Sequence, residues 1–207
     1  AGDAEENSAV ETHPRQGEGH GAEQRRRFRI QRRHVDAART LSHPRKFRRH
    51  VLCRAVRSHE AERGQSMQVG TLDFKILNPA RPLGTDTNNN SIVLSLSYGE
   101  IDFLFMGDAE RQAESSMLSL VSDIEILKVG HHGSRSSSSP EFLNLTKPEV
   151  AIYTAGIRNS YGHPHQETIV ALAEVSAEIY GTDIHGTIII TTDGKSYSLQ
   201  REIPAPP

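Results

Sequence analysis

The sequence predicts an α/β (α+β) fold, with helices covering a mixed sheet, over residues 67–207. Short apolar segments with the pattern of strands alternate there with segments that have the pattern of amphipathic helices. The alternation ends in two strand patterns joined by Asp193-Gly194, a dipeptide typical of hairpin turns. Residues 1–66 show neither pattern, so we treat them as a separate segment.

This first segment, residues 1–66, differs from the rest in composition. It holds 15 of the 24 Lys and Arg residues and 9 of the 26 Asp and Glu residues, a balance of +6. Residues 67–207 carry the opposite balance, -8. The first segment has only nine Leu, Ile, Val or Phe residues, a share below that of chains able to bury a core. We therefore expect it to be disordered, with arginines that could contact nucleic acid through charge alone.

The first elements expected in residues 67–207 are antiparallel strands and a helix. Residues 72–76 and 91–97 alternate apolar with polar side chains, which is the period of a half-buried strand. Tyr98-Gly99-Glu100 predicts a tight turn, and residues 101–106 are apolar enough for a strand buried on both faces. Apolar residues at helical spacing follow Asp108 and predict a helix there.

The remaining elements alternate between strand and helix. Residues 124–129 and 150–154 are short apolar runs typical of buried strands. Pro140 favours the first turn of a short helix, and residues 167–175 have the spacing of an amphipathic helix. The last three strands are expected over residues 179–180, 187–191 and 196–200.

Asp108 is the first candidate site residue. It directly follows the strand expected over residues 101–106. A carboxylate at the carboxyl end of a buried strand lies where sheet proteins place their ligands. Asp is also a favoured N-cap of the helix that follows, so the two roles stay open.

Two histidine-containing loops are the next candidates. Gly130-His131-His132-Gly133-Ser134 follows a buried strand, and imidazoles beside glycines suit a divalent metal or a phosphate. Hydrogen bonding of these histidines to the backbone is the alternative. For His163 and His165, metal binding, phosphate contact and a role at the start of a helix are all open.

The order and spacing of these motifs resemble the C-terminal domain of ComEC-type competence proteins, over about residues 67–202. The resemblance implies the C-terminal part of a metallo-β-lactamase-like αββα sandwich, descended from a metal-dependent nuclease or phosphodiesterase. It also implies single-stranded DNA as partner, and a parent protein at the bacterial cell membrane. The segments that carry it are Asn88-Asn89-Asn90-Ser91, Gly107-Asp108, residues 127–134, residues 137–142, residues 161–165 and Gly186-Thr187-Ile188.

The same resemblance implies roles for individual residues. Asp108 would be the carboxylate that bridges two metals. One of His131 and His132, preferably His132, would be a further metal ligand. The other residues expected in the pocket are His163, His165, Ser134 and Asn90.

One family motif is missing from the chain. Members of the family carry His-x-His-x-Asp-His, which supplies ligands to both metals, and no such string occurs here. A catalytic metal site usually has three protein ligands and a water, whereas Asp108 and one histidine provide two. We expect a divalent metal, zinc or manganese, to bind weakly or not at all and hydrolysis to be impaired, so whether the chain is an enzyme is open.

The missing motif suggests that residues 1–66 are a coding segment read out of frame. The nucleotide sequence tests this hypothesis, which fails if no other frame encodes His-x-His-x-Asp-His or a near relative. Alternative functions are a non-catalytic module that binds nucleic acid or a partner, and a truncated product without stable function. The single cysteine, Cys53, excludes an internal disulfide, and no apolar run is long enough to span a bilayer. We expect a soluble chain, in a compartment that the sequence does not indicate.

Overall fold

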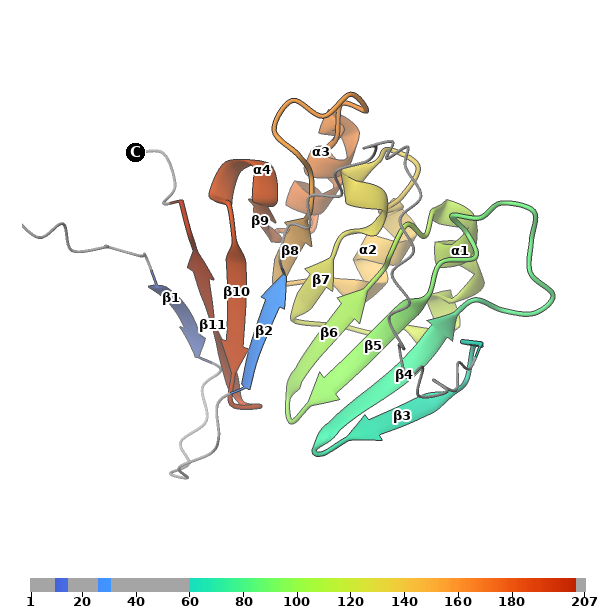
Figure 1. The fold of residues 1–207 in the computed structure, drawn as a ribbon, viewed down its shortest axis with the longest axis horizontal. Coiled ribbons are helices and arrows are strands. Elements are labelled where there is room, and N and C mark those ends of the chain that lie inside the picture. The colour runs from blue at the N-terminus through green and yellow to red at the C-terminus, as the bar shows by residue number, and fades with distance from the viewer. Residues whose placement is uncertain (1–9, 15–25, 31–59, 204–207) are drawn as a thin grey trace, which may run out of the picture.

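The computed structural model describes residues 10–14, 26–30 and 60–203. The strands of its larger sheet are β3 (Ser66–Val69), β4 (Leu72–Asn78), β5 (Val93–Tyr98), β6 (Ile101–Phe105), β7 (Ile126–Lys128), β8 (Val150–Tyr153) and β9 (Glu178–Gly181). A smaller sheet contains β1 (Val10–Pro14), β2 (Arg26–Ile30), β10 (Ile188–Thr192) and β11 (Ser196–Arg201). The α-helices are α1 (Arg111–Ser116), α2 (Pro140–Thr146), α3 (Gln166–Glu174) and α4 (Thr182–His185). Figure 1 shows the smaller sheet beside the larger one.

The larger sheet changes its type of pairing at β6. Its strand order is β3-β4-β5-β6-β7-β8-β9, antiparallel from β3 to β6 and parallel from β6 to β9. In the parallel half, Phe103 lies opposite Ile126, which lies opposite Val150. The carboxyl ends of β6, β7 and β8 therefore meet at one edge of the sheet, where open α/β sheets bind ligands.

The two faces of the larger sheet bury different partners. Ile126 and Leu127, neighbours on β7, belong to different apolar clusters because successive strand residues point to opposite faces. One cluster joins the sheet to the helices and includes Leu104, Leu127, Ala151, Phe142 and Leu172. The other joins it to the smaller sheet and includes Phe103, Ile126, Ile152, Ile190 and Leu199. The described residues thus form helix, sheet and sheet layers, an α+β arrangement consistent with the predicted metallo-β-lactamase-like fold.

The two sheets also meet at their turns. The backbone N–H of Glu100 donates to the carbonyl of Gly194, at 2.6 Å. A Cβ atom on Gly99 would lie 2.1 Å from that carbonyl oxygen, and Gly99 has a φ of +63°. The turn between β5 and β6 therefore needs glycine, both for its backbone conformation and for its contact with the β10–β11 hairpin.

The structure differs from the sequence-based expectations around α1. The N-cap of α1 is Glu110, so Asp108 lies before the helix and does not cap it. The helix ends at Ser116 and a 3-10 turn, Leu118–Leu120, follows, where the sequence predicted one continuous helix. Two short elements, β3 and α4, were not predicted from the sequence.

The first segment contains two strands that the sequence did not predict. Here β1 pairs with β11 and β2 pairs with β10, both antiparallel. Because strand formation depends on partners distant in sequence, local periodicity gives little sign of such strands. The disorder expected of the segment is wrong also for residues 60–66, which the structure describes: the N–H of Gly64 donates to the carbonyl of Ile76, at 2.9 Å, and β3 begins at Ser66. Residues 1–9, 15–25 and 31–59, which include Cys53, lie outside the described residues. Of the helices that the structure describes, none is long and apolar enough to cross a bilayer.

Candidate functional site

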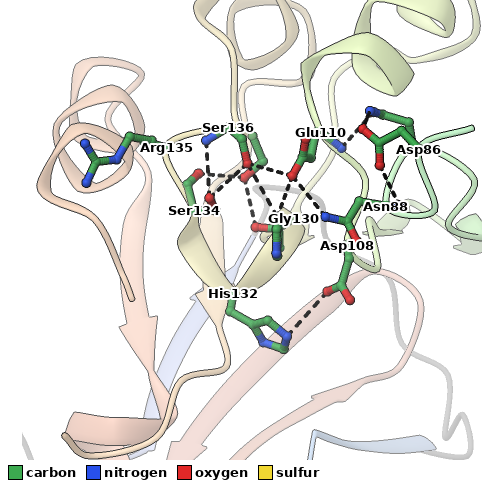
Figure 2. A network of polar contacts seen from close by, with 12 residues as sticks. Asp86, Asn88, Asp108, Glu110, Gly130, His132, Ser134, Arg135 and Ser136 are labelled. Atoms are coloured by element: carbon green, nitrogen blue, oxygen red, sulfur yellow. Dashed lines mark hydrogen bonds and ion pairs between the residues drawn. The ribbon is translucent and has the colours of Figure 1, made fainter. Parts of the chain in front are cut away.

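Asp108 and His132 face each other at the carboxyl edge of the parallel strands. Asp108 follows β6 and His132 follows β7, and His132 Nε2 lies 3.4 Å from Asp108 Oδ1 (Figure 2). Both side chains are about half exposed, at 46% and 47%. The ends of the two parallel strands therefore bring these side chains together.

The imidazole of His132 is oriented from its other side. Its Nδ1 lies 2.7 Å from the carbonyl oxygen of Thr154, just after β8, and 3.3 Å from the hydroxyl of that residue. A carbonyl can only accept, so Nδ1 carries the hydrogen and Nε2 faces Asp108. Histidines that bind metals are held in this way by a second group on the far nitrogen.

His131 is held by a different partner, Glu110. The Oε1 atom of Glu110 lies 2.9 Å from His131 Nδ1 and also accepts hydrogen bonds from Asn88 Nδ2 and Ser136 Oγ, at 3.1 and 3.0 Å. Figure 2 shows Glu110 between Asn88 and Ser136. The two adjacent histidines therefore have separate anchors, and only His132 is paired with Asp108.

The loop that carries these histidines has an unusual backbone. His131 and His132 have φ values of +43° and +56°, in the left-handed region. That region costs an L-residue roughly 1–2 kcal/mol, and such strain is concentrated at functional sites. The flanking glycines allow close packing: a Cβ on Gly130 would lie 2.8 Å from the carbonyl oxygen of Ala109, and one on Gly133 would lie 2.8 Å from Pro164 Cβ.

His163 and His165 belong to the same cluster of rings. The ring centroid of His163 lies 5.6 Å from that of His131, 6.3 Å from that of His132 and 4.8 Å from that of His165. Burial and the neighbouring imidazoles lower the pKa of His163, while the carboxylate of Asp108 opposes the shift. The loop before α3 therefore brings a third imidazole to the edge where Asp108 and His132 meet.

His165 has a structural role in addition. It is the N-cap residue of α3, and its Nδ1 accepts a hydrogen bond from the backbone N–H of Arg135, at 3.1 Å. Its own backbone N–H donates to the carbonyl of Gly133, at 2.9 Å. His165 thus joins the two histidine loops, which is the helix-start role left open by the sequence.

Of the two remaining residues expected in the pocket, Ser134 lies in the hydrogen-bond network at the site, and Asn90 holds a neighbouring loop. Ser134 Oγ lies 2.9 Å from Ser136 Oγ, so it belongs to the network around Glu110. Asn90 makes two hydrogen bonds with the backbone of Gly84, at 3.0 and 2.7 Å, and helps to hold that loop. Asn88, from the same run of asparagines, is the one that reaches Glu110.

Sequence reasoning missed Glu110 and Glu114. Glu114 is buried and accepts hydrogen bonds from the backbone N–H groups of Ser138 and Ser139. Burial raises its pKa. The two carboxylates, four residues apart, thus hold both ends of the loop of residues 136–139. Their spacing was the available signal in the sequence.

Two potential metal donors of the described residues converge at this edge. Asp108 and His132 converge, while Nδ1 of His131 is engaged by Glu110. Among the residues that the structure describes, no group of three or more His, Cys, Asp or Glu side chains is arranged to hold a metal ion. The donor types suit zinc or manganese, whereas their number falls short of a catalytic centre.

Comparison with known proteins finds relatives in several bacteria. The chain is 37% identical to "ComE operon protein 3" of Bacillus subtilis over 131 residues, 62% of this chain and 17% of the relative. It is 32% identical to "Recombination protein 2" of Haemophilus influenzae (56% of this chain, 15% of the relative) and to "Competence protein ComA" of Neisseria gonorrhoeae (60% and 18%). The chain is homologous to ComEC-type competence proteins.

The ComEC-type relatives are several times longer than the matched region, since each alignment spans less than a fifth of their length. No protein-family model matches the chain. The homology agrees with the resemblance found in the sequence motifs.

Proposed function

We propose that residues 67–207 are the C-terminal part of a nuclease- or phosphodiesterase-type hydrolase domain that acts in competence DNA uptake. In this chain the domain binds single-stranded DNA at the Asp108–His132 edge and hydrolyses it weakly or not at all. The observation that carries the proposal is the pairing of Asp108 with a histidine held in place by the Thr154 carbonyl. The names of the homologues support the link to competence.

Binding of DNA at this edge follows from its chemistry. The four clustered imidazoles are hydrogen-bond donors to phosphate oxygens when protonated. Arg135 lies beside them in an exposed ion pair with Glu167, at 3.5 Å, which a phosphate can replace. Phosphate contacts of this kind are independent of base sequence. We therefore expect affinity that falls as salt concentration rises.

The resemblance to ComEC-type competence proteins also implies the location of the parent protein. We propose that this parent protein lies at the bacterial cell membrane.

Impaired hydrolysis follows from the number of metal donors. A catalytic ion normally has three protein ligands and an open position for water. Asp108 and His132 supply two, so we propose that the chain holds at most one zinc or manganese ion, and holds it loosely. His132, which faces Asp108, is the ligand of the histidine pair, while His131 is engaged with Glu110.

A nuclease assay with a metal analysis tests this function. The full chain is incubated with single-stranded DNA and excess manganese or zinc, beside a ComEC-type domain that carries His-x-His-x-Asp-His. We expect little or no cleavage by this chain, and none by Asp108→Ala. Turnover comparable to that of the motif-bearing domain would contradict the proposal and would show that other residues replace the missing ligands.

A non-catalytic module is the second candidate, favoured by the incomplete donor set. Such a module would bind nucleic acid or a protein partner without a metal. Salt-sensitive binding of single-stranded DNA that is independent of metal and of Asp108 would favour this candidate. A chain without cooperative thermal unfolding would instead indicate a truncated product.

A further inference from the structure

Tyr161 is exposed at the edge of the histidine cluster. Its exposed fraction is 78%, whereas the other four tyrosines of the chain are 3% to 9% exposed. A ring that buries so little of its surface contributes little to the stability of the fold. Packing therefore does not explain why an aromatic residue stands at this position.

The ring of Tyr161 begins a series of nearly parallel rings that leads to the site. Tyr161 and His163 are stacked, with centroids 5.7 Å apart and planes at 21°. His163 and His132 are stacked in turn, with centroids 6.3 Å apart and planes at 19°. The inner end of the series, His132, is the residue that faces Asp108. The outer end offers an aromatic face to solvent.

The loop that presents Tyr161 is held in one conformation by Asn159. Its side-chain Nδ2 donates to the carbonyls of Gly156 and His163, at 2.9 and 2.6 Å, and its Oδ1 accepts from the N–H of His163, at 2.9 Å. These bonds span both sides of Tyr161. A loop whose backbone is held before its ligand arrives loses less conformational entropy on binding.

We propose that Tyr161 is a stacking platform for an unpaired nucleobase, placed so that the adjoining phosphodiester lies toward Asp108 and His132. The inference rests on the proposed binding of single-stranded DNA and adds to it a base-binding position. An aromatic face binds every base but requires that the base be unpaired, so it selects single strands without reading sequence. Arg158, exposed in the same loop, adds a charge suited to the DNA backbone.

A fluorescence experiment tests the contact directly. The chain contains no tryptophan, so Tyr161→Trp introduces a single indole at this position. We expect a short single-stranded oligothymidine to quench that indole at saturation, and a duplex of the same length to leave it unchanged. Quenching by both to the same extent, or by neither, would overturn the stacking role.

Binding measurements separate this inference from the proposed function. We expect Tyr161→Ala to weaken binding of the oligothymidine about tenfold, since base–aromatic stacking has that magnitude, and Tyr161→Phe to retain it. For an abasic oligonucleotide with the same phosphates, Tyr161→Ala should change nothing. Ile184→Ala, which also truncates an exposed apolar side chain, is the control.

Each outcome of these measurements has a distinct meaning. Equal loss of affinity for the abasic and the base-bearing strand would overturn the inference, because Tyr161 would then support the loop rather than a base. Unchanged binding of both strands by Tyr161→Ala would overturn the inference and leave the proposed function standing. Absence of binding to either strand by the wild-type chain would overturn both.

Discussion

Oε1 of Glu110 lies 2.9 Å from Nδ1 of His131, and the same oxygen accepts hydrogen bonds from Asn88 and Ser136. The neighbouring His132 is held through the same ring atom by a backbone carbonyl. Both imidazoles therefore have Nδ1 engaged, and Nε2 of His132 faces Asp108. Glu110 positions one member of the pair as Thr154 positions the other.

The first prediction concerns the tautomer of His131. An ionised carboxylate only accepts hydrogen bonds, so we expect His131 Nδ1 to carry a hydrogen in the wild-type chain. Glu110→Ala should shift His131 toward the tautomer with the hydrogen on Nε2, which nitrogen-15 NMR of labelled histidine distinguishes. It should also destabilise the fold by about 1–3 kcal/mol, because three donors lose their acceptor.

Glu141→Ala is the matched control for this measurement, since Glu141 is an exposed glutamate in the first turn of α2. Its His131 signals should equal those of the wild type. Wild-type His131 with a bare Nδ1 would contradict the assignment of Glu110 as the positioning residue.

The second prediction concerns metal binding. We expect calorimetric titration with manganese or zinc to show at most one ion per chain, bound loosely. Asp108→Ala and His132→Ala should each abolish that binding, because each removes one of two converging donors. Asp123→Ala removes an exposed carboxylate and should leave it unchanged. Two tightly bound ions would show that the donor set extends beyond the described residues.

The third prediction uses Lys128, at the end of β7. Burial lowers its pKa to about 8 from 10.5, and the charge of Asp108 partly opposes the shift. Between pH 8 and 10.5 the unfolded chain therefore binds more protons at this residue than the folded chain, and this group makes stability rise with pH. Below pH 8 Lys128 is charged although buried, which lowers the stability of the folded state.

Lys128→Met should therefore stabilise the protein near neutral pH, by roughly 1–3 kcal/mol. The advantage over the wild type should shrink as pH rises from 8 to 10, in urea unfolding at each pH. Lys195→Met, at an exposed position, is the control and should show no such trend. A difference in stability between Lys128→Met and the wild type that stays constant from pH 8 to 10 would refute the lowered pKa of Lys128.

The fourth prediction uses the buried Glu114. Its folded pKa is raised above 4.5 by burial, so the folded state binds the extra proton more readily than the unfolded state. The resulting stabilisation is complete below pH 4.5 and is lost as pH rises through the folded pKa. Glutamine does not titrate, so the stability of Glu114→Gln relative to the wild type should improve as pH rises from 4.5 toward neutrality, in urea unfolding at each pH. A relative stability that falls over this range would be inconsistent with the raised pKa.

Local sequence patterns predicted those elements that are short apolar runs or have a regular repeat of apolar residues. The buried strands β6 and β7 are such runs, α3 has the repeat of an amphipathic helix, and the structure contains all three. The meeting of Asp108 and His132 was also predictable, because both follow parallel strands in a mixed sheet. The groups that orient the two histidines were not predictable in the same way. A hydrogen bond such as that from His132 to the backbone carbonyl of Thr154 leaves no pattern of side chains in the sequence.

The anchors of the two histidines differ in how they respond to mutation. The carbonyl that orients His132 belongs to the backbone, so no substitution of the Thr154 side chain removes it. The carboxylate that holds His131 is a side chain, and a single codon change can delete it. Orientation of the histidine that faces Asp108 is thus protected during sequence divergence, whereas orientation of its neighbour has to be maintained by selection at position 110.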